Sequence, residues 1–206
     1  MRKLIYSMMV SLDGFIDRRP PLPAGDRAGE RGSTRPDDTN QLDWVIIDEE
    51  IHSFANDEAR EAGTFLYGRR LYENMAAFWP AADTLPDMPD YVVEFARIWK
   101  PKPKIVFSKT LDQVEWNSRL VRGDVAEEVE KLKAQPGGDL SVGGANLAAT
   151  LIGRGLVDEY RLLVHPVVIG SGTPFFPPVR SDIKLRLLET KRFSSGVVFL
   201  RYEPSS

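Results

Sequence analysis

Short apolar strands that alternate with helices constrain the fold of this chain more than any other feature. Leu4 to Val10 is a nearly continuous apolar run without helical periodicity, which predicts a strand buried on both faces. Three further predicted strands, at 64–67, 104–107 and 140–142, each end in glycine or in a polar pair. Helices are predicted over 48–62, 70–78, 91–99, from Asp124 to the glycines at 137–138, and over 145–152. This order predicts an α/β fold with a mostly parallel central sheet and helices on both faces.

The C-terminal part departs from this alternation. Tyr160 to His165, Ile183 to Glu189 and Val197 to Tyr202 are predicted strands with no helix between them. We therefore expect this part to add antiparallel strands at an edge of the sheet. A chain of 206 residues is expected to form a single domain over residues 1–206.

One segment interrupts the predicted domain. Residues 17–43 contain four prolines, three glycines and eleven charged residues, with Leu22 and Leu42 as the only large aliphatic side chains. This composition predicts a long surface loop inserted after the first strand. The loop is either a mobile insertion or a lid over a site at that strand's end.

Composition excludes several classes of site. The chain has no cysteine, which excludes disulfides, thiolate nucleophiles and cysteine-ligated metal centres. Two histidines are too few for a three-histidine zinc centre, and no metal is expected. A net charge of −3 without a dense basic block argues against nucleic acid as the partner. No apolar run is long enough to span a membrane, and a cytoplasmic protein is expected.

Glycines and cations gather where the predicted strands end. The segment Gly143-Gly144-Ala145-Asn146 lies between a strand and a helix, where free amide groups could bind a pyrophosphate. Taken alone, this pair is better explained by a tight turn that requires glycine. Two other strand ends carry Gly68-Arg69-Arg70 and Ser108-Lys109, which could together hold a phosphomonoester. Because ligands bind outside the carboxyl ends of parallel strands, the three motifs predict one anion site.

Two further segments could border a substrate. Ser11-Leu12-Asp13-Gly14-Phe15-Ile16 places a carboxylate and a glycine at the end of the first strand, although Asp-Gly is also a common turn. The segment from Gly170 to Phe176 could line a flat heterocycle or form a plain hairpin turn. His52 and His165 have no serine or aspartate partner at motif spacing, so ordinary packing is their expected role.

Taken in order, the motifs Ser11-Leu12-Asp13-Gly14, Leu66-Tyr67-Gly68-Arg69, Val106-Phe107-Ser108-Lys109, Val142-Gly143-Gly144 and the segment 169–176 resemble the dihydrofolate reductase-like superfamily. The most similar branch is the reductase domain of riboflavin-pathway deaminase-reductases, the RibD C-terminal domain family. The resemblance covers almost the whole chain except residues 17–43. The zinc deaminase half of those enzymes is absent, so the chain resembles a reductase domain standing alone.

The resemblance implies NADPH as the cofactor. It places Gly143, Gly144, Ala145 and Asn146 at the pyrophosphate, and it places around the adenosine and its 2′-phosphate the residues Gly68, Arg69, Arg70, Ser108 and Lys109. It implies that Ser11 and Ile16 border the nicotinamide and that Asp13 and Thr173 face the substrate as catalytic residues. It also implies frequent homodimers, and it allows a cis peptide bond at Gly143-Gly144.

The function that follows is an NADPH-dependent reductase that transfers a hydride to a small heterocyclic substrate, with a ribosylaminopyrimidine as the leading candidate. Dihydrofolate or pterin reduction is the alternative among enzymes. Folate-reducing members carry an acid in the first helix at a position near His52, where this chain has none. A non-catalytic NADPH-binding module is the alternative from another class.

Overall fold

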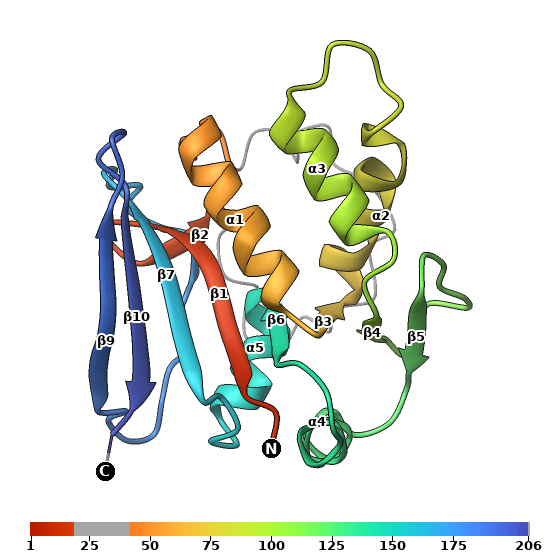
Figure 1. Ribbon diagram of the computed structural model, residues 1–206. Helices are drawn as coiled ribbons and strands as arrows, with labels where there is room; N and C mark the ends of the chain where they lie inside the picture. The colour runs from red at the N-terminus through yellow and green to blue at the C-terminus, as the bar shows by residue number, and fades with distance from the viewer. Residues whose placement is uncertain (19–41, 206) are drawn as a thin grey trace.

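The computed structural model describes residues 1–18 and 42–205, and its centre is an eight-stranded sheet (Figure 1). The strand order is β5-β4-β3-β6-β1-β7-β10-β9. The strands are β1 (Leu4–Ser11), β3 (Thr64–Gly68), β4 (Lys104–Phe107), β5 (Ser118–Val121), β6 (Leu140–Gly143), β7 (Glu159–His165), β9 (Leu185–Arg192) and β10 (Val198–Pro204). The short strands β2 (Phe15–Asp17) and β8 (Thr173–Pro174) pair with each other in a separate ribbon.

Neighbouring strands from β5 to β7 run parallel, whereas β10 is antiparallel to both β7 and β9. The predicted fold class is therefore confirmed. One detail of the prediction is wrong, because Tyr160–His165 belongs to β7, which pairs in parallel with β1 inside the sheet. The helix over 145–152 is the crossover connection that makes this pairing possible. Only the last two long strands form the antiparallel edge.

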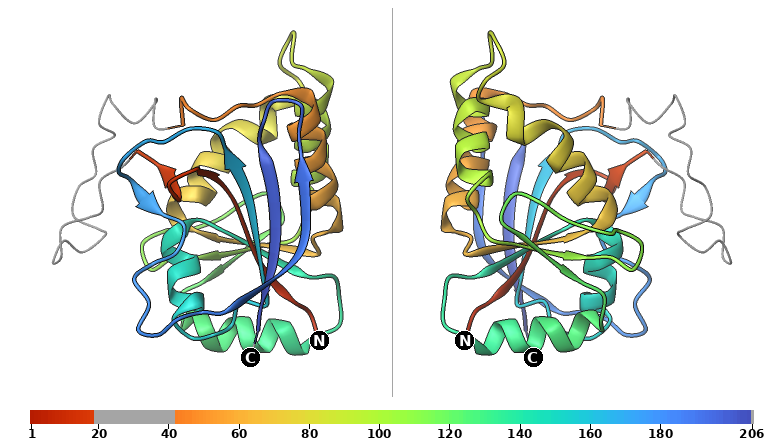
Figure 2. Two further views of the ribbon diagram at one scale, coloured as in Figure 1. Left: turned by 90° about the vertical axis from the view of Figure 1, so that its left-hand side faces the viewer. Right: turned by 90° about the vertical axis from the view of Figure 1, so that its right-hand side faces the viewer.

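Helices cover both faces of the sheet (Figure 2). The helices are α1 (Glu49–Glu61), α2 (Arg69–Ala82), α3 (Asp90–Trp99), α4 (Val125–Ala134) and α5 (Ala145–Ile152). Side chains of α1, α2 and α3 share an apolar cluster with β3 and β4, and α4 and α5 share another with β1 and β6. Alternate residues of one strand reach the two layers, as Tyr67 and Leu66 do in β3.

The helices begin in two different ways. Asp48 and Asp124 precede α1 and α4, and the carboxylate of each accepts hydrogen bonds from amides in the first turn. Asp48 and Asp124 are also the residues at which the sequence predicts these two helices to begin. By contrast, α2 and α5 follow Gly68 and Gly144 and have no side-chain cap. Their first amides are therefore left to other partners.

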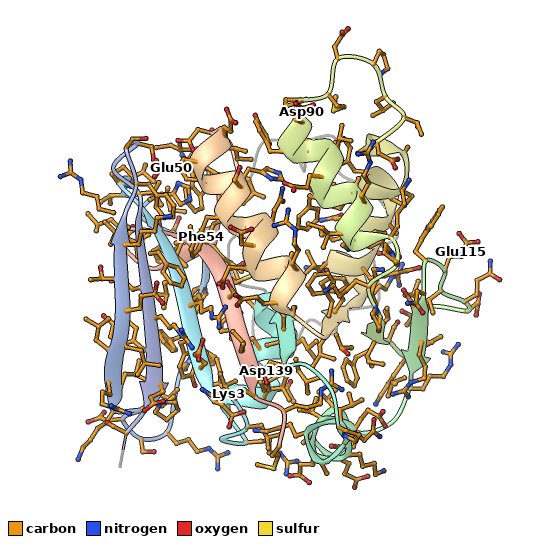
Figure 3. All side chains as sticks on the ribbon, viewed as in Figure 1. Lys3, Glu50, Phe54, Asp90, Glu115 and Asp139 are labelled. Atoms are coloured by element: carbon orange, nitrogen blue, oxygen red, sulfur yellow. The ribbon has the colours of Figure 1, made fainter. Side chains whose placement is uncertain are left out.

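The antiparallel edge is joined to α1 by aromatic contacts and hydrogen bonds. Phe54 of α1, labelled in Figure 3, packs edge-on against Phe193 and Phe199, with ring centroids 5.3 and 4.7 Å away. Glu50, one turn earlier, accepts hydrogen bonds from the amide and hydroxyl of Ser194 at 2.9 and 2.7 Å. These contacts fix the N-terminal end of α1 beside the turn between β9 and β10. In the described part of the chain, no helix is long and apolar enough to cross a membrane.

Most of the predicted loop over 17–43 lies outside the described residues. Asp17 ends β2, and Arg18 pairs with Asp43 across the base of the segment, with Nε and Oδ1 2.9 Å apart. Trp44 is buried, and the amide of Ile46 donates to Nδ1 of His165 at 3.2 Å. The segment that leads into α1 is therefore bonded to the end of β7.

Candidate cofactor and substrate site

The predicted site residues gather at one edge of the sheet. Because β1, β3, β4, β5, β6 and β7 are parallel, their carboxyl ends all lie at this edge. The motifs at these ends are Gly68-Arg69-Arg70 at β3, Ser108-Lys109 at β4, Gly143-Gly144 at β6 and Ser11-Leu12-Asp13 at β1. Their place relative to a ligand remains a prediction.

The glycines that end β6 and β3 lie where the starts of α2 and α5 approach each other. A Cβ added to Gly143 would lie 2.6 Å from Cδ2 of Leu71 in the first turn of α2, and one added to Gly68 would lie 3.9 Å from Cβ of Leu147 in α5. Gly144 has φ +89°, a conformation that other residues rarely adopt. The Gly143–Gly144 peptide is trans, so the cis bond that the resemblance allowed is not present.

The N-termini of α2 and α5 thus lie side by side without side-chain caps. Uncapped amides at a helix N-terminus present hydrogen-bond donors and a partial positive charge. Two such ends follow the neighbouring strands β3 and β6, and their amide donors suit a pyrophosphate. The residues present therefore fit the cofactor that the resemblance implies.

Arg69 is fixed within the protein. Its Nε donates to Oε1 of Glu73 at 2.8 Å, and its Nη1 donates to Oγ1 of Thr110 at 2.8 Å. Ser108 is also engaged, because its Oγ accepts from the amides of Thr110 and Leu111 at 3.1 and 3.0 Å. The contacts of Arg69 and Ser108 therefore order the loop after β4. Among the described residues, no hydrogen bond engages the charged groups of Arg70 and Lys109.

Arg122 is a residue of this region that the sequence analysis did not single out. It directly follows β5, and its guanidinium donates to the carbonyl oxygens of Lys109 and Leu111 at 3.2 and 2.5 Å. Arg69 follows β3 and Arg122 follows β5, so the two arginines hold the 108–112 loop from the two sides of β4. A cation directly after a strand, here β5, is the same pattern that identified Arg69 and Lys109.

Asp13 connects the two loops at the ends of β1 and β7. Its carboxylate accepts from the Ser11 hydroxyl at 2.6 Å and from the amides of Gly170 and Ile169 at 2.7 and 3.2 Å. The hydrogen bond from Ser11, followed by those from the amides, holds the pKa of Asp13 below its ordinary value. Asp13 is therefore an ionised group that organises this end of the site.

The other predicted substrate and nicotinamide residues lie in or beside the β2–β8 ribbon. Ile16 is buried in the main core, and Thr173 pairs with Asp17 across the ribbon. A Cβ on Gly172 would overlap the carbonyl oxygen of Asp17, so glycine is required for this close approach. The ribbon thus joins the loop after β1 to the loop after β7.

The two histidines occupy different environments. His52 packs against the rings of Trp79, Tyr91 and Phe95 in α2 and α3, at centroid distances of 6.1, 4.9 and 5.9 Å. His165 is fully buried, and burial lowers its pKa. Across residues 1–18 and 42–205, no three histidine, aspartate or glutamate side chains form a group that could hold a metal ion.

Comparisons with known proteins match residues 2–199 to the RibD C-terminal domain. YyaP of Bacillus subtilis, an uncharacterized protein, is 35% identical over 202 residues that cover 98% of this chain and 94% of YyaP. YwjB of the same organism, also uncharacterized, is 27% identical over 199 residues that cover 95% of each chain.

Solved structures show the same fold. A provisionally assigned riboflavin biosynthesis protein from Shewanella sp. PV-4 matches with a TM-score of 0.65 over the whole of both chains, at 18% identity. Dihydrofolate reductase from Enterococcus faecalis, complexed with NADP(H), has a TM-score of 0.59 at 15% identity over 99% of this chain and 97% of that chain. The Thermotoga maritima deaminase/reductase also gives 0.59, at 13% identity, over 99% of this chain and 57% of that one. The expected dihydrofolate reductase-like fold is confirmed.

Proposed function

The chain belongs to the RibD C-terminal domain family, and from that membership we propose that it is an NADPH-dependent reductase of a small heterocyclic substrate. Members of this family typically bind NADPH. The observation that carries the proposal is the pair of uncapped helix N-termini at the ends of β3 and β6, beside cations at the ends of β3, β4 and β5. A dinucleotide phosphate needs both kinds of group.

Each part of the edge has a role in this proposal. The first amides of α5, at Ala145 and Asn146, would bind the pyrophosphate, and Gly144 leaves them open to it. Arg69, Arg70 and Lys109 would surround the 2′-phosphate, with Arg122 holding the loop that carries Lys109. The loops after β1 and β7 would then border the nicotinamide and the substrate.

When bound, NADPH would supply a hydride to an electrophilic carbon of the substrate and would itself become NADP⁺. Asp13 does not deliver the accompanying proton at neutral pH, because its depressed pKa keeps it ionised. Its role is to hold the loops after β1 and β7 together, so that the substrate is oriented. The proton then comes from solvent. Thr173 stays our candidate for direct contact with the substrate.

Three readings of the function remain to be separated. A ribosylaminopyrimidine substrate follows from the family, and dihydrofolate or a pterin follows from the fold. The folate reading is weakened because folate-reducing members carry an acid near the position of His52, whose side chain here packs against rings of α2 and α3. A non-catalytic NADPH-binding module would bind the cofactor and turn over neither substrate. A homodimer is also proposed from the family alone.

Substitution of Arg69 tests the cofactor assignment. Arg69→Ala is expected to weaken NADPH binding about tenfold and to leave NADH binding unchanged, because only NADPH carries the 2′-phosphate. The measurement is a titration of the purified protein with each nucleotide, followed by nicotinamide fluorescence and by thermal stabilisation.

Arg186→Ala is the matched control, because Arg186 lies on β9, outside the strands whose carboxyl ends form the site. It removes the same charge and should change neither affinity. Equal losses for NADPH and NADH in Arg69→Ala would contradict a 2′-phosphate contact. If the wild-type protein binds neither nucleotide, the reductase proposal is wrong.

A further inference from the structure

The chain has two histidines, and one of them, His165, lies fully buried at the carboxyl end of β7. Its neighbour across the sheet is Ser11 of β1, which is also buried. The ring of Trp44 meets the imidazole edge-on, with the ring centroids 5.5 Å apart. His165 therefore lies between the end of the sheet and residues 42–48, the segment that leads into the start of α1 (Figure 1).

One hydrogen bond fixes the protonation state of this ring. The amide of Ile46 donates to Nδ1 of His165, with the two nitrogen atoms 3.2 Å apart. Because a backbone amide can only donate a hydrogen bond, Nδ1 must carry a lone pair and accept it. The proton of the neutral ring is then on Nε2, which is buried and has no hydrogen-bond partner in the described part of the chain. The contact thus requires the neutral ring with its proton on Nε2.

Protonation of His165 is incompatible with this contact. The proton would be added at Nδ1, where it would face the Ile46 amide as a second donor. The hydrogen bond would be lost, and the resulting cation would be buried without a replacement for it. A proton on Nδ1 and a bond from Ile46 therefore exclude each other.

The charged groups around the ring favour the cation too weakly to change this balance. Asp48 is the group whose charge acts on His165 and raises its pKa, but burial is the larger effect and lowers it overall. The acids of the neighbouring segments, Asp13, Asp43 and Glu50, are held by other partners. Leu163, on the same face of β7, belongs to a cluster of apolar side chains.

Residues 42–48 are held at three places. Arg18 pairs with Asp43 at one end, and Oδ1 of Asp48 accepts from the amide of Ile51 at the other, at 2.8 Å. The middle of the segment is held by His165, which contacts both the Trp44 ring and the Ile46 amide. A change in the charge of this one side chain therefore acts on the whole middle of the segment.

From this geometry we propose that His165 is a pH-sensitive latch, which bonds residues 42–48 to β7 while its ring is neutral and releases them when the ring takes up a proton. The contact is fully stable above the ordinary histidine pKa of about 6.5 and weakens as pH falls, because the released state binds the proton more readily. These residues lie at the edge where β1 and β7 end, so the latch acts beside the candidate site. Neither the latch nor its test requires the proposed reductase activity.

Nitrogen NMR of the imidazole rings tests the latched state. In the wild-type protein at about pH 7.5, His165 should show an unprotonated Nδ1 and a protonated Nε2. His52 is the other histidine of the chain, so the spectrum of His52→Asn identifies the signals of each ring. A His165 ring protonated at Nδ1 would overturn the proposal, because it could not accept from the Ile46 amide.

Hydrogen exchange of the Ile46 amide tests the release. After correction for the intrinsic pH dependence of exchange, its protection in the wild-type protein should fall about tenfold between about pH 7.5 and pH 5.5. This range lies above the ordinary pKa values of carboxylates, so the histidines are the side chains expected to titrate in it.

Two variants assign the effect to one ring. His165→Asn can still accept a hydrogen bond but does not titrate, and its protection at Ile46 should be independent of pH over this range. His52→Asn is the matched control and should keep the pH dependence of the wild-type protein. Constant protection in the wild-type protein, or loss of the pH dependence in His52→Asn, would overturn the proposal. These two outcomes decide it even if His165→Asn fails to fold.

Discussion

Replacement of Glu159 by glutamine is expected to lower the free energy of unfolding by about 3 kcal/mol, because it removes the buried carboxylate that Arg161 and Arg201 share. Glu159 is fully buried in β7, and it accepts hydrogen bonds from Nε of Arg161 at 2.6 Å and from Nε and Nη2 of Arg201 at 2.8 and 2.9 Å. Arg161 is itself buried and also pairs with Glu58 of α1. Urea unfolding followed by circular dichroism measures the loss.

A second substitution provides the control for this experiment. Glu189 lies on β9, and its side chain is 48% exposed. Its contact with Nη1 of Arg201 is long, at 3.5 Å. Glu189→Gln also removes one carboxylate that pairs with Arg201. It should lower the free energy of unfolding by less than about 1 kcal/mol. Similar losses for the two variants would mean that burial of Glu159 does not set the strength of the network.

The pH dependence of the loss provides an independent check. Burial alone would raise the pKa of Glu159, but hydrogen bonds from Arg201 and Arg161 outweigh this effect, so its pKa lies below the ordinary value. The unfolded state therefore binds the proton more readily, and stability from this group is lost as pH falls through the folded-state pKa. The difference between the wild-type and Glu159→Gln proteins should be largest above about pH 4.3 and should shrink at lower pH.

The order of elements could be predicted because it depends on local signals. The apolar run of β1, the aspartate caps of α1 and α4, and the glycines after β3 and β6 are all legible in a few consecutive residues. A strand's partner is not a local property. Residues 160–165 therefore suggested an antiparallel edge strand, whereas β7 joins β1 in parallel.

Buried charges were the other feature that the sequence could not reveal. Lys104 is part of a predicted strand, and its ammonium is buried, donating to the carbonyl oxygens of Trp99, Lys102 and Trp116 at 2.6, 2.9 and 2.7 Å. Burial lowers its pKa to about 8. Because this value is still above neutral pH, the ammonium stays protonated there. Its acceptors lie at the C-terminal end of α3, in the turn after it, and just before β5. Only folding brings these segments together.

The candidate site was predictable in position more than in detail. Strand ends and glycines located the edge where a cofactor could bind. The contacts of Arg69 with Glu73 and Thr110, and the support that Arg122 gives to the 108–112 loop, depend on how α2, β4 and β5 pack.

The largest effect on ligand binding is expected from Gly144→Val. Gly144 has φ +89°, and a β-branched side chain there costs about 1–3 kcal/mol in backbone strain. Relief of that strain would turn the first amides of α5 away from the pyrophosphate. Hydrogen bonds to a charged group contribute about 1.5–3 kcal/mol each, so the loss of two predicts a fall in NADPH affinity of about 100-fold or more.

Gly155→Val separates strain from ligand contact. Gly155 also has a positive φ, +67°, and has open space around its Cβ position, but it precedes β7 at the opposite edge of the sheet. Both variants should unfold at lower urea concentration than the wild-type protein, and only Gly144→Val should lose NADPH in a fluorescence titration. If Gly155→Val lost the same affinity, general destabilisation would explain both results. If Gly144→Val kept its affinity, the pyrophosphate could not bind at the start of α5.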